Sequence, residues 1–246
     1  MQSSPEASEV VSLEELQEEV DTTALSAAGP RQILEHLEDM VLHPDYPCLG
    51  ARSVFNTERA TVEVLDELAT AGATQVLLDR LPHFVEGTHL TEGFASFVAV
   101  FRGPVVESED EFEQLLWRQL EQLHAADDLP WNDQVSADPD NPHFAFSVRG
   151  TAFFVVGMHP NASRIARRAP LPTLVFNLHE QFEELRASER YLRMRDTIRR
   201  RDSELQGSVN PMVRDHGVQS EARQYSGRAV PVDWEPPAAL GPPARS

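Results

Sequence analysis

The sequence predicts an α+β fold in a single domain, with a mainly antiparallel sheet covered by helices. Two apolar runs, Phe144–Val148 and Ala152–Val156, are joined only by Arg149-Gly150, a spacing typical of a β-hairpin. Because strands that follow each other so closely pair antiparallel, this pattern favours α+β over a doubly wound parallel sheet. The chain has 246 residues, 41% of them hydrophobic, which is enough for one sizeable core.

The chain is expected to have three parts. Residues 1–28 are rich in Glu, Ser and Ala and contain little that can build a core, so they predict a mobile acidic leader. Residues 29–228 contain the periodic apolar patterns and predict the α+β domain. Residues 229–246 are rich in proline and predict an irregular tail.

Periodic apolar residues predict the helices of this domain. Arg31–His43 carries an apolar stripe on one helical face, and Glu58–Arg80 is a second stretch with helical character. Ser108 and Glu111 have the spacing of a capping box and start a third helix with a long apolar face. A long charged helix is expected at Glu180–Asp202.

Two further buried strands, Phe97–Phe101 and Thr173–Phe176, join the hairpin. The remaining segment, Leu205–Arg228, is polar and rich in turn-forming residues. A long ordered loop in a compact domain is usually functional, and the alternative is a surface coil. The polar side chains that this loop offers are those of Asn210, Asp215, His216, Glu221, Arg223, Gln224, Tyr225 and Arg228.

The chain is strongly acidic, with 40 Asp and Glu residues against 21 basic residues and a net charge of −19. Such a charge disfavours nucleic acid as a partner and favours a cationic small substrate. All 21 basic residues are arginine, which excludes a lysine Schiff base. The lone cysteine and the lack of an apolar leader or membrane-length apolar run indicate a protein of the cytoplasm, away from the membrane.

The most informative stretch is TAFFVVGMHPNASRIARR, residues 151–168. An apolar strand ends at Gly157 and is followed by one imidazole, His159, with three arginines close behind in the sequence. An imidazole on a rigid apolar element beside clustered guanidinium groups supplies what a haem needs, an axial nitrogen for iron and cations for two propionates. The alternative interpretation is a strand, a loop and an arginine-rich surface.

Two other residues are candidate iron ligands. His179 also follows a strand-like segment, and its alternative role is that of a helix-terminal residue packed against Phe182. Cys48 lies in a turn with Arg52 nearby, which lowers a thiol pKa, and its alternative role is that of a small buried hydrophobe. The chain has no HExxH, CxxC, GxGxxG, P-loop or GxSxG motif, which disfavours a zinc site, dinucleotide or NTP binding, and a hydrolase nucleophile.

Carboxylates that could pair a cationic ligand occur in two loops. Asp127, Asp128 and Asp133 surround Trp131 in a loop dense in Asp, Asn and Pro, and Glu221 lies in the later polar loop. A guanidinium matches a carboxylate through two parallel hydrogen bonds, so any of these groups is a possible substrate anchor.

Several segments together resemble the YqcI/YcgG family, and more closely its branch containing the guanitoxin-biosynthesis haem-dependent N-hydroxylase. They are PCLGARS, EFEQLLWRQLEQLH, DPDNPHFAFSVRGTAFFVVGMHPNASRIARR, TLVFNLHEQFEELR, IRRRDSELQGSVNP and SEARQYSGR. The similarity runs from about Asp45 to Trp234. The family's HP-x-x-SR motif and the RR pair that follows it correspond here to His159, Pro160, Ser163, Arg164, Arg167 and Arg168.

The resemblance implies a haem-dependent monooxygenase that hydroxylates a guanidine-type nitrogen of an arginine-like amino acid. Its cofactor is expected to be haem b, bound non-covalently because the chain has no CxxCH motif. Molecular oxygen is the co-substrate, and a reductase or a ferredoxin-like protein supplies electrons. The competing interpretations are a haem-binding or haem-sensing protein without turnover, and a small-molecule binding module without haem.

Specific roles follow from this interpretation. The axial ligand is expected to be His159, with His179 and Cys48 as the alternatives. With a histidine ligand, oxygen cleavage needs hydrogen-bond donors from the polar loop, and the residues expected to act in catalysis are Asn210, Arg223 and Tyr225. The residues expected to contact the cofactor are His159, Ser163, Arg164, Arg167, Arg168 and Cys48.

Overall fold

The computed structural model describes residues 11–89, 93–186, 190–208, 210, 212, 219–237 and 240. They form one five-stranded sheet with the strand order β1-β2-β5-β4-β3. The β1–β2 pair is parallel and the other three pairs are antiparallel, which confirms the predicted α+β fold with a mainly antiparallel sheet. The strands are β1 Ala60–Glu67, β2 Ser96–Gly103, β3 Phe146–Val148, β4 Thr151–Met158 and β5 Thr173–Leu178.

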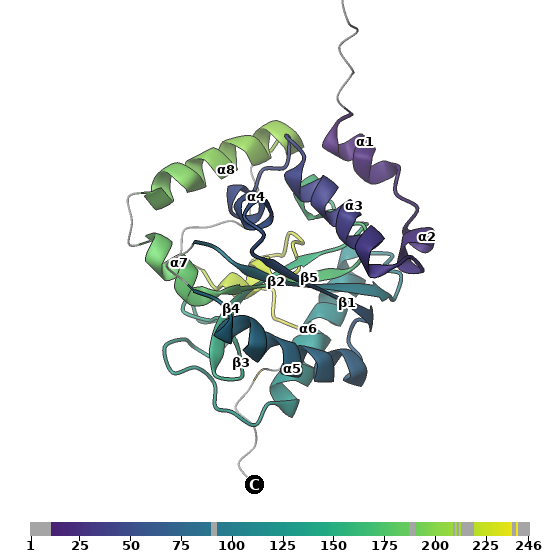
Figure 1. The fold of residues 1–246 in the computed structure, drawn as a ribbon. Coiled ribbons are helices and arrows are strands. Elements are labelled where there is room, and N and C mark those ends of the chain that lie inside the picture. The colour runs from purple at the N-terminus through teal and green to yellow at the C-terminus, as the bar shows by residue number, and fades with distance from the viewer. Residues whose placement is uncertain are drawn as a thin grey trace, which may run out of the picture.

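Helices cover both faces of this sheet. Figure 1 shows the first four helices and α8 on one side of the strands, with α5 and α6 on the other. None of the helices in the described part of the chain is long and apolar enough to cross a membrane. The helices are α1 Leu13–Glu18, α2 Thr22–Ser26, α3 Pro30–Leu42, α4 Leu49–Asn56, α5 Ala71–Glu86, α6 Glu109–Ala126, α7 His179–Arg186 and α8 Arg190–Gln206, with short 3-10 turns η2 Ile165–Arg167 and η3 Glu221–Gln224.

The helices on the two faces of the sheet pack over separate hydrophobic cores, because successive side chains of a strand point to opposite faces. In β2, Phe97 and Phe101 point into the core beneath α5 and α6, whereas Val98 and Val100 belong to the core beneath α1 to α4. A strand buried on both faces reads as a continuous apolar run, which is why β2 was evident from the sequence.

The predicted hairpin is confirmed. β3 and β4 pair antiparallel, with Val148 opposite Thr151. The two turn residues, Arg149 and Gly150, both have left-handed backbone conformations, with φ of 54° and 73°. This matches the two-residue turn whose twist suits a hairpin.

The helical prediction for Glu58–Arg80 is wrong over its first half. Residues of β1 alternate between the two faces, and Val62 and Val64 pack on the α1 to α4 side. β-branched residues with a period of two favour a strand over a helix. The predicted helix at Glu180–Asp202 is instead two helices, α7 and α8, with residues 187–189 outside the described part.

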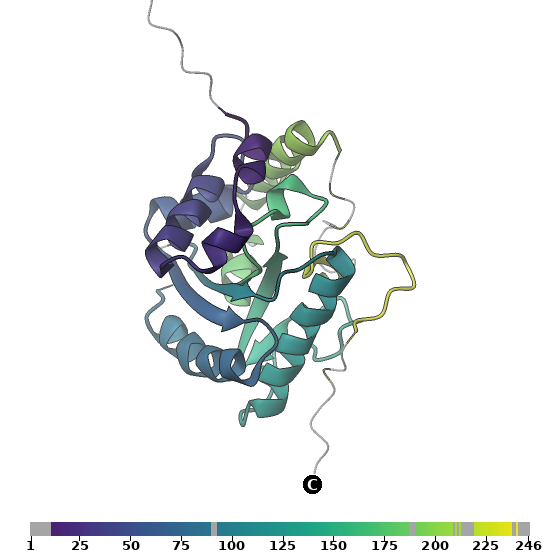
Figure 2. The ribbon, with the colours of Figure 1, turned by 90° about the vertical axis from the view of Figure 1, so that its right-hand side faces the viewer.

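Part of the expected mobile leader is folded. Residues 1–10 lie outside the described residues, but residues 11–28 form α1 and α2, which bury Leu13 and Leu25 against the domain. The side chains of Ser12 and Asp21 cap these two helices. In the expected tail, residues 229–237 have no helix or strand (Figure 2). Trp234 of this segment nevertheless packs against Trp117 of α6.

Candidate functional site

The pairing of β4 with β5 separates the two candidate histidines. Met158 lies opposite Thr173, whereas Phe153 lies opposite Leu178. His159 therefore follows one end of the strand pair, and His179 follows the other. Six residues of strand at about 3.3 Å each place the two imidazoles on the order of 20 Å apart, so they belong to different sites.

His159 is buried, with only 1% of its surface exposed. Its ring stacks on Phe112 of α6, with ring centroids 4.4 Å apart, and its backbone N–H donates to the Arg167 carbonyl at 3.0 Å. Among the described residues, neither ring nitrogen has a hydrogen-bond partner. A buried unpaired polar group costs about 1–3 kcal/mol, so two such nitrogens on one ring indicate a ligand that completes the site.

The same burial sets the protonation state of this imidazole. Burial lowers the pKa of His159 to about 4; Glu109 opposes this shift and the Arg167 guanidinium adds to it. The ring is therefore neutral at neutral pH, which is the form that binds a metal.

Gly157 allows the end of β4 to approach its neighbours closely. Its N–H donates to the Tyr225 carbonyl at 2.7 Å. A Cβ at this position would lie 2.6 Å from side-chain atoms of both Leu116 and Phe112, the ring that stacks on His159. A glycine is therefore required where β4, α6 and the C-terminal segment meet.

Gly157→Ala is expected to destabilise the protein by about 1–3 kcal/mol, because the added methyl group overpacks this junction. Urea denaturation measures the change. Gly72→Ala in α5 is the matched control, since nothing lies within 4 Å of its added methyl group. Equal stability of the two variants would show that α6 moves aside at no cost.

The three arginines that follow His159 extend to different partners. Arg164 pairs with Asp202 of α8 at 2.6 Å, and Arg168 pairs with Glu14 of α1 at 2.8 Å. Arg167 donates to two carbonyls, of Gly157 at 2.8 Å and of Gln224 at 3.3 Å. Among the described residues, no carboxylate lies within ion-pair distance of Arg167.

Ser163 has a different role from the arginines. Its N–H and its hydroxyl both donate to the same Glu109 carboxylate oxygen, at 2.9 and 2.8 Å. This ties the loop after His159 to the first turn of α6, which carries Phe112. Ser163 therefore positions the loop.

Cys48 and a tyrosine that the sequence did not single out lie at the same end of β4 as His159. Tyr46 is buried, burial raises its pKa, and its hydroxyl donates to the Met158 sulfur at 3.9 Å. Cys48 caps α4 and is half-buried, with its sulfur accepting from the Ala51 N–H at 3.5 Å. The turn HPDYPC gave no signal for Tyr46, because its contact with Met158 spans 112 residues.

The three residues expected to act in catalysis lie in different places. The Asn210 N–H donates to Asp202 at 3.2 Å, which places Asn210 beside the ion pair of Arg164 and Asp202. Arg223 donates to the carbonyls of Trp234 and Pro231 and lies over the Trp234 ring, so it secures the C-terminal segment. Tyr225 is fully buried in the core. Asp215 and His216 lie outside the described residues.

A second polar cluster lies at the other end of β4. The Tyr225 hydroxyl lies 2.9 Å from Glu221, accepts from the Phe146 N–H at 3.1 Å and lies 3.2 Å from the Phe153 carbonyl. Burial raises the pKa of Glu221 to about 8, although the Tyr225 hydrogen bond and the Arg186 charge oppose the shift.

His179 begins α7 beside this second cluster. Its Nε2 lies 3.4 Å from Glu183, which also pairs with Arg186. The Glu183 charge adds to the raised pKa of Glu221. His179 and Glu221 thus both lie close to Glu183 of α7, whereas His159 lies at the other end of β4.

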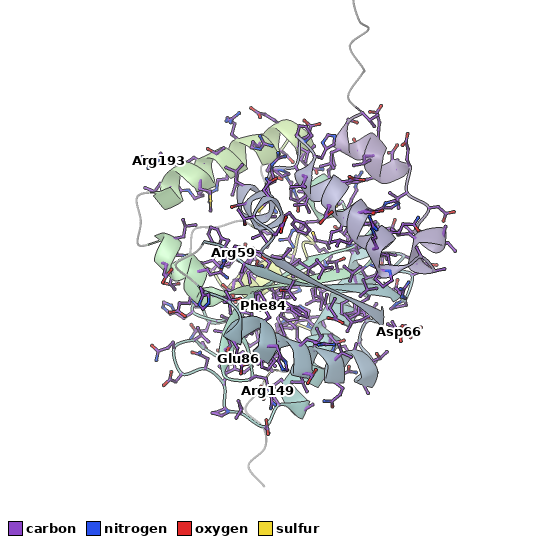
Figure 3. The ribbon with its side chains drawn as sticks, in the orientation of Figure 1. Arg59, Asp66, Phe84, Glu86, Arg149 and Arg193 are labelled. Carbon is purple, nitrogen blue, oxygen red and sulfur yellow. The ribbon has the colours of Figure 1, made fainter. Side chains whose placement is uncertain are left out.

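The predicted carboxylate anchors lie far from His159. Asp127 and Asp128 pair with Arg149 at the hairpin turn, ten residues before His159 in the chain. Figure 3 shows Arg149 at the end of the molecule opposite Arg193 of α8. A strand of that length spans about 30 Å. Glu221 is linked through Tyr225 to Phe153, six residues before His159 and on the order of 20 Å away. Asp127, Asp128 and Glu221 therefore lie too far from His159 to contact a small group bound at its ring. Asp133, in the same loop as Asp127, accepts from the Gln134 side chain.

Two cavities stand out among the described residues, and neither has His159 in its wall. The larger, about 420 Å³, lies between β1 and α5 and is lined by Arg59, Glu63 and Phe84, among others. The smaller, about 40 Å³, touches Pro160 and Arg168. The described residues also contain no group of three or more His, Cys, Asp or Glu side chains that could share a metal ion. His159 thus offers a single-imidazole site that is closed in this structure.

Comparisons with known proteins agree with the resemblance seen in the sequence. The chain is 25% identical over 189 residues to the uncharacterized protein YcgG of Bacillus subtilis (strain 168), covering 73% of this chain and 75% of YcgG. It is 25% identical over 162 residues to the uncharacterized protein YqcI of the same organism, covering 63% and 64% of the two chains.

A third relative has a name that states an activity. It is "Putative N(omega)-hydroxy-L-arginine synthase DcsA" of Streptomyces lavendulae, 25% identical over 162 residues, which cover 62% of this chain and 60% of DcsA. The chain thus spans less than two thirds of the length of YqcI and of DcsA. No solved structure matches it. The family model described as YqcI/YcgG family matches residues 37–239, well over half of the sequence, and the chain therefore belongs to the YqcI/YcgG family.

Proposed function

We propose that this protein is a haem-dependent monooxygenase that hydroxylates a guanidino nitrogen of an arginine-like amino acid. The observation that carries the proposal is the neutral, buried imidazole of His159, whose two ring nitrogens lack partners among the described residues. The relative named as an N(omega)-hydroxy-L-arginine synthase supports the reaction and the substrate class.

The residues at this end of β4 fit haem b in kind. His159 offers a neutral nitrogen to iron, and Phe112 holds the ring plane by stacking. Arg167 offers a guanidinium with no carboxylate partner among the described residues, which suits a propionate. His159 is closed off in this structure, so entry of a haem-sized group requires the segments around it to move.

When bound, haem supplies oxygen activation: two electrons from an external donor and two protons reduce one oxygen atom to water, and the other enters an N–H bond. His159 would hold the iron, and burial keeps its ring neutral. Of the three residues expected to act in catalysis, Asn210 lies on this side of the domain. Tyr225 adjoins this side through its backbone carbonyl, which accepts from the Gly157 N–H, while its hydroxyl lies at Phe153. Arg223 secures the C-terminal segment.

Absorption spectra of the protein supplied with haem test the proposal. A Soret band that shifts on reduction and with carbon monoxide is expected, together with a shift on adding arginine. Incubation with arginine, a reductase and ¹⁸O₂ is expected to give a product heavier by one labelled oxygen. A Soret band without any oxygenated product from arginine or related guanidines favours a haem-binding or haem-sensing protein, and no Soret band excludes both.

Arg167→Gln is expected to weaken haem retention about tenfold or more, because a buried propionate loses its charged partner. Arg168→Gln is the matched control, since Arg168 pairs with Glu14 of α1. Transfer of haem to apomyoglobin measures the rate of loss. Equal rates for the two variants would remove Arg167 from the site.

A further inference from the structure

Polar contacts attach α8 to the domain. None of the α8 side chains that the structure describes is completely buried, and its one apolar contact with the core beneath α1 to α4 that the structure describes is the partly buried Leu205. The helix is tied to the loop after His159 through Asp202 on Arg164 and through Gln206, which accepts from the Ile165 N–H at 2.8 Å. On its other side, Arg201 donates to the Tyr46 carbonyl at 2.9 Å. A helix held in this way can detach at a lower cost than one with a buried apolar face.

The contact between Arg164 and Asp202 is strong but incomplete. One guanidinium nitrogen, Nη2, donates to one carboxylate oxygen at 2.6 Å, and both side chains are largely buried. The Nε–H of Arg164 is buried and has no partner among the described residues. Arginine binds a carboxylate best through two parallel hydrogen bonds, and half of that arrangement is missing here.

The local charge also lacks an anion. Arg164 and Arg167 lie one turn apart, and burial and the charge of Arg164 both lower the pKa of Arg167. Asp202 is the carboxylate that faces this pair from α8, and Tyr46 and Cys48 are its other near neighbours. Asp202 therefore pairs with Arg164, and among the described residues Arg167 has only carbonyl acceptors, those of Gly157 and Gln224.

We propose that Arg164 and Arg167 form a binding site for a ligand carboxylate, which Asp202 of α8 fills when no ligand is bound. A ligand carboxylate replaces Asp202 on Arg164 and also engages the Nε–H that Asp202 leaves unpaired. Asp202 then releases α8, which opens the region of Tyr46, Cys48 and His159. The link to His159 rests on the proposed function, but the carboxylate site itself does not.

The exchange keeps the charge constant, because one carboxylate replaces another. It gains a hydrogen bond at Arg164 and loses the polar contacts of α8, so release of the helix is coupled to binding. The carboxylate could come from a haem propionate or from the α-carboxylate of an amino-acid substrate. Both sources offer the same group to the two arginines.

Paired ligands distinguish these sources. Arginine is compared with agmatine, which lacks the carboxylate, and haem with haem dimethyl ester, which lacks free propionates. Hydrogen exchange of the α8 amides reports release of the helix. Faster exchange with arginine but not agmatine assigns the site to the substrate. Faster exchange with haem but not its ester assigns it to propionate. No change with any of the four ligands overturns the proposal.

Asp202→Asn tests the competition directly. The variant is expected to bind the effective carboxylate ligand about tenfold more tightly, because the internal competitor is gone, and to exchange its α8 amides faster without ligand. Asp196→Asn, on the exposed side of α8, is the matched control. Equal affinity in the two variants overturns the proposal. If no variant gives a Soret band but arginine still speeds α8 exchange, the haem assignment fails and the carboxylate site stands.

Discussion

Replacement of His159 by phenylalanine is expected to abolish haem binding and leave the protein folded. Phenylalanine keeps the stacking on Phe112 and removes the nitrogen that binds iron. It also removes two buried nitrogens that lack partners among the described residues, so the free energy of unfolding should rise by about 1–3 kcal/mol. Loss of the Soret band together with an unchanged or higher urea midpoint is the expected result.

His179→Phe is the matched control for this experiment, because His179 lies at the other end of the β4–β5 pair. It should retain the Soret band and the reduced carbon monoxide spectrum. A folded His159→Phe variant with full haem content, beside a His179→Phe variant without it, would move the iron to the cluster of Glu183, Arg186 and Glu221. Retention of haem by both variants would leave Cys48 as the remaining candidate ligand.

The sequence predicted those parts of the fold that depend on local pattern. β2 and the β3–β4 hairpin were found because a continuous apolar run and a two-residue turn are local signals. β1 was missed because Val64, Leu65 and Leu68 have helical spacing, which hid the short alternation of Val62, Glu63 and Val64 in this edge strand. A short acidic helix at Val11–Val20 is visible in the sequence, but the packing of residues 11–28 on the domain was missed, because their few apolar residues, Leu13 and Leu25, fill gaps in a core built by other segments.

The candidate site was predictable only in part, for the same reason. His159 was evident because a buried strand leads directly to it and Pro160 follows. The roles of the three arginines were not evident, because their partners, Glu14, Asp202 and the Gly157 carbonyl, come from three different segments. Spacing in the sequence suggested one basic patch, and only the tertiary contacts show that each arginine has a different partner.

Glu221→Gln is expected to remove the pH dependence of stability that this buried carboxyl imposes. Its pKa is about 8 in the folded protein, against an ordinary value of 4.5. Between these two values the folded state holds a proton that the unfolded state has lost, so stability falls as pH rises from 4.5 to 8. Above pH 8 the full cost is present, and at 1.36 kcal/mol per pKa unit it is on the order of 5 kcal/mol.

Contacts of the Glu221 carboxyl explain why glutamine suits the position. Tyr225 has a single hydroxyl proton, and both Glu221 and the Phe153 carbonyl lie within its reach. An ionised Glu221 draws that proton away from Phe153, whereas a neutral amide or protonated acid can itself donate to the hydroxyl oxygen. Glu221→Gln keeps this arrangement at every pH.

Urea titrations of the apoprotein between pH 5 and 9 measure the effect, with the exposed Glu184→Gln on α7 as the matched control. The parent and the control should lose stability toward pH 9, and Glu221→Gln should lose much less. His159 contributes the opposite slope: its folded pKa of about 4 lies below the ordinary 6.5, so its cost appears as pH falls below 6.5. A parent slope above pH 6.5 that Glu221→Gln leaves unchanged would show that the carboxyl is ionised in the folded protein, with Arg186 as its effective partner.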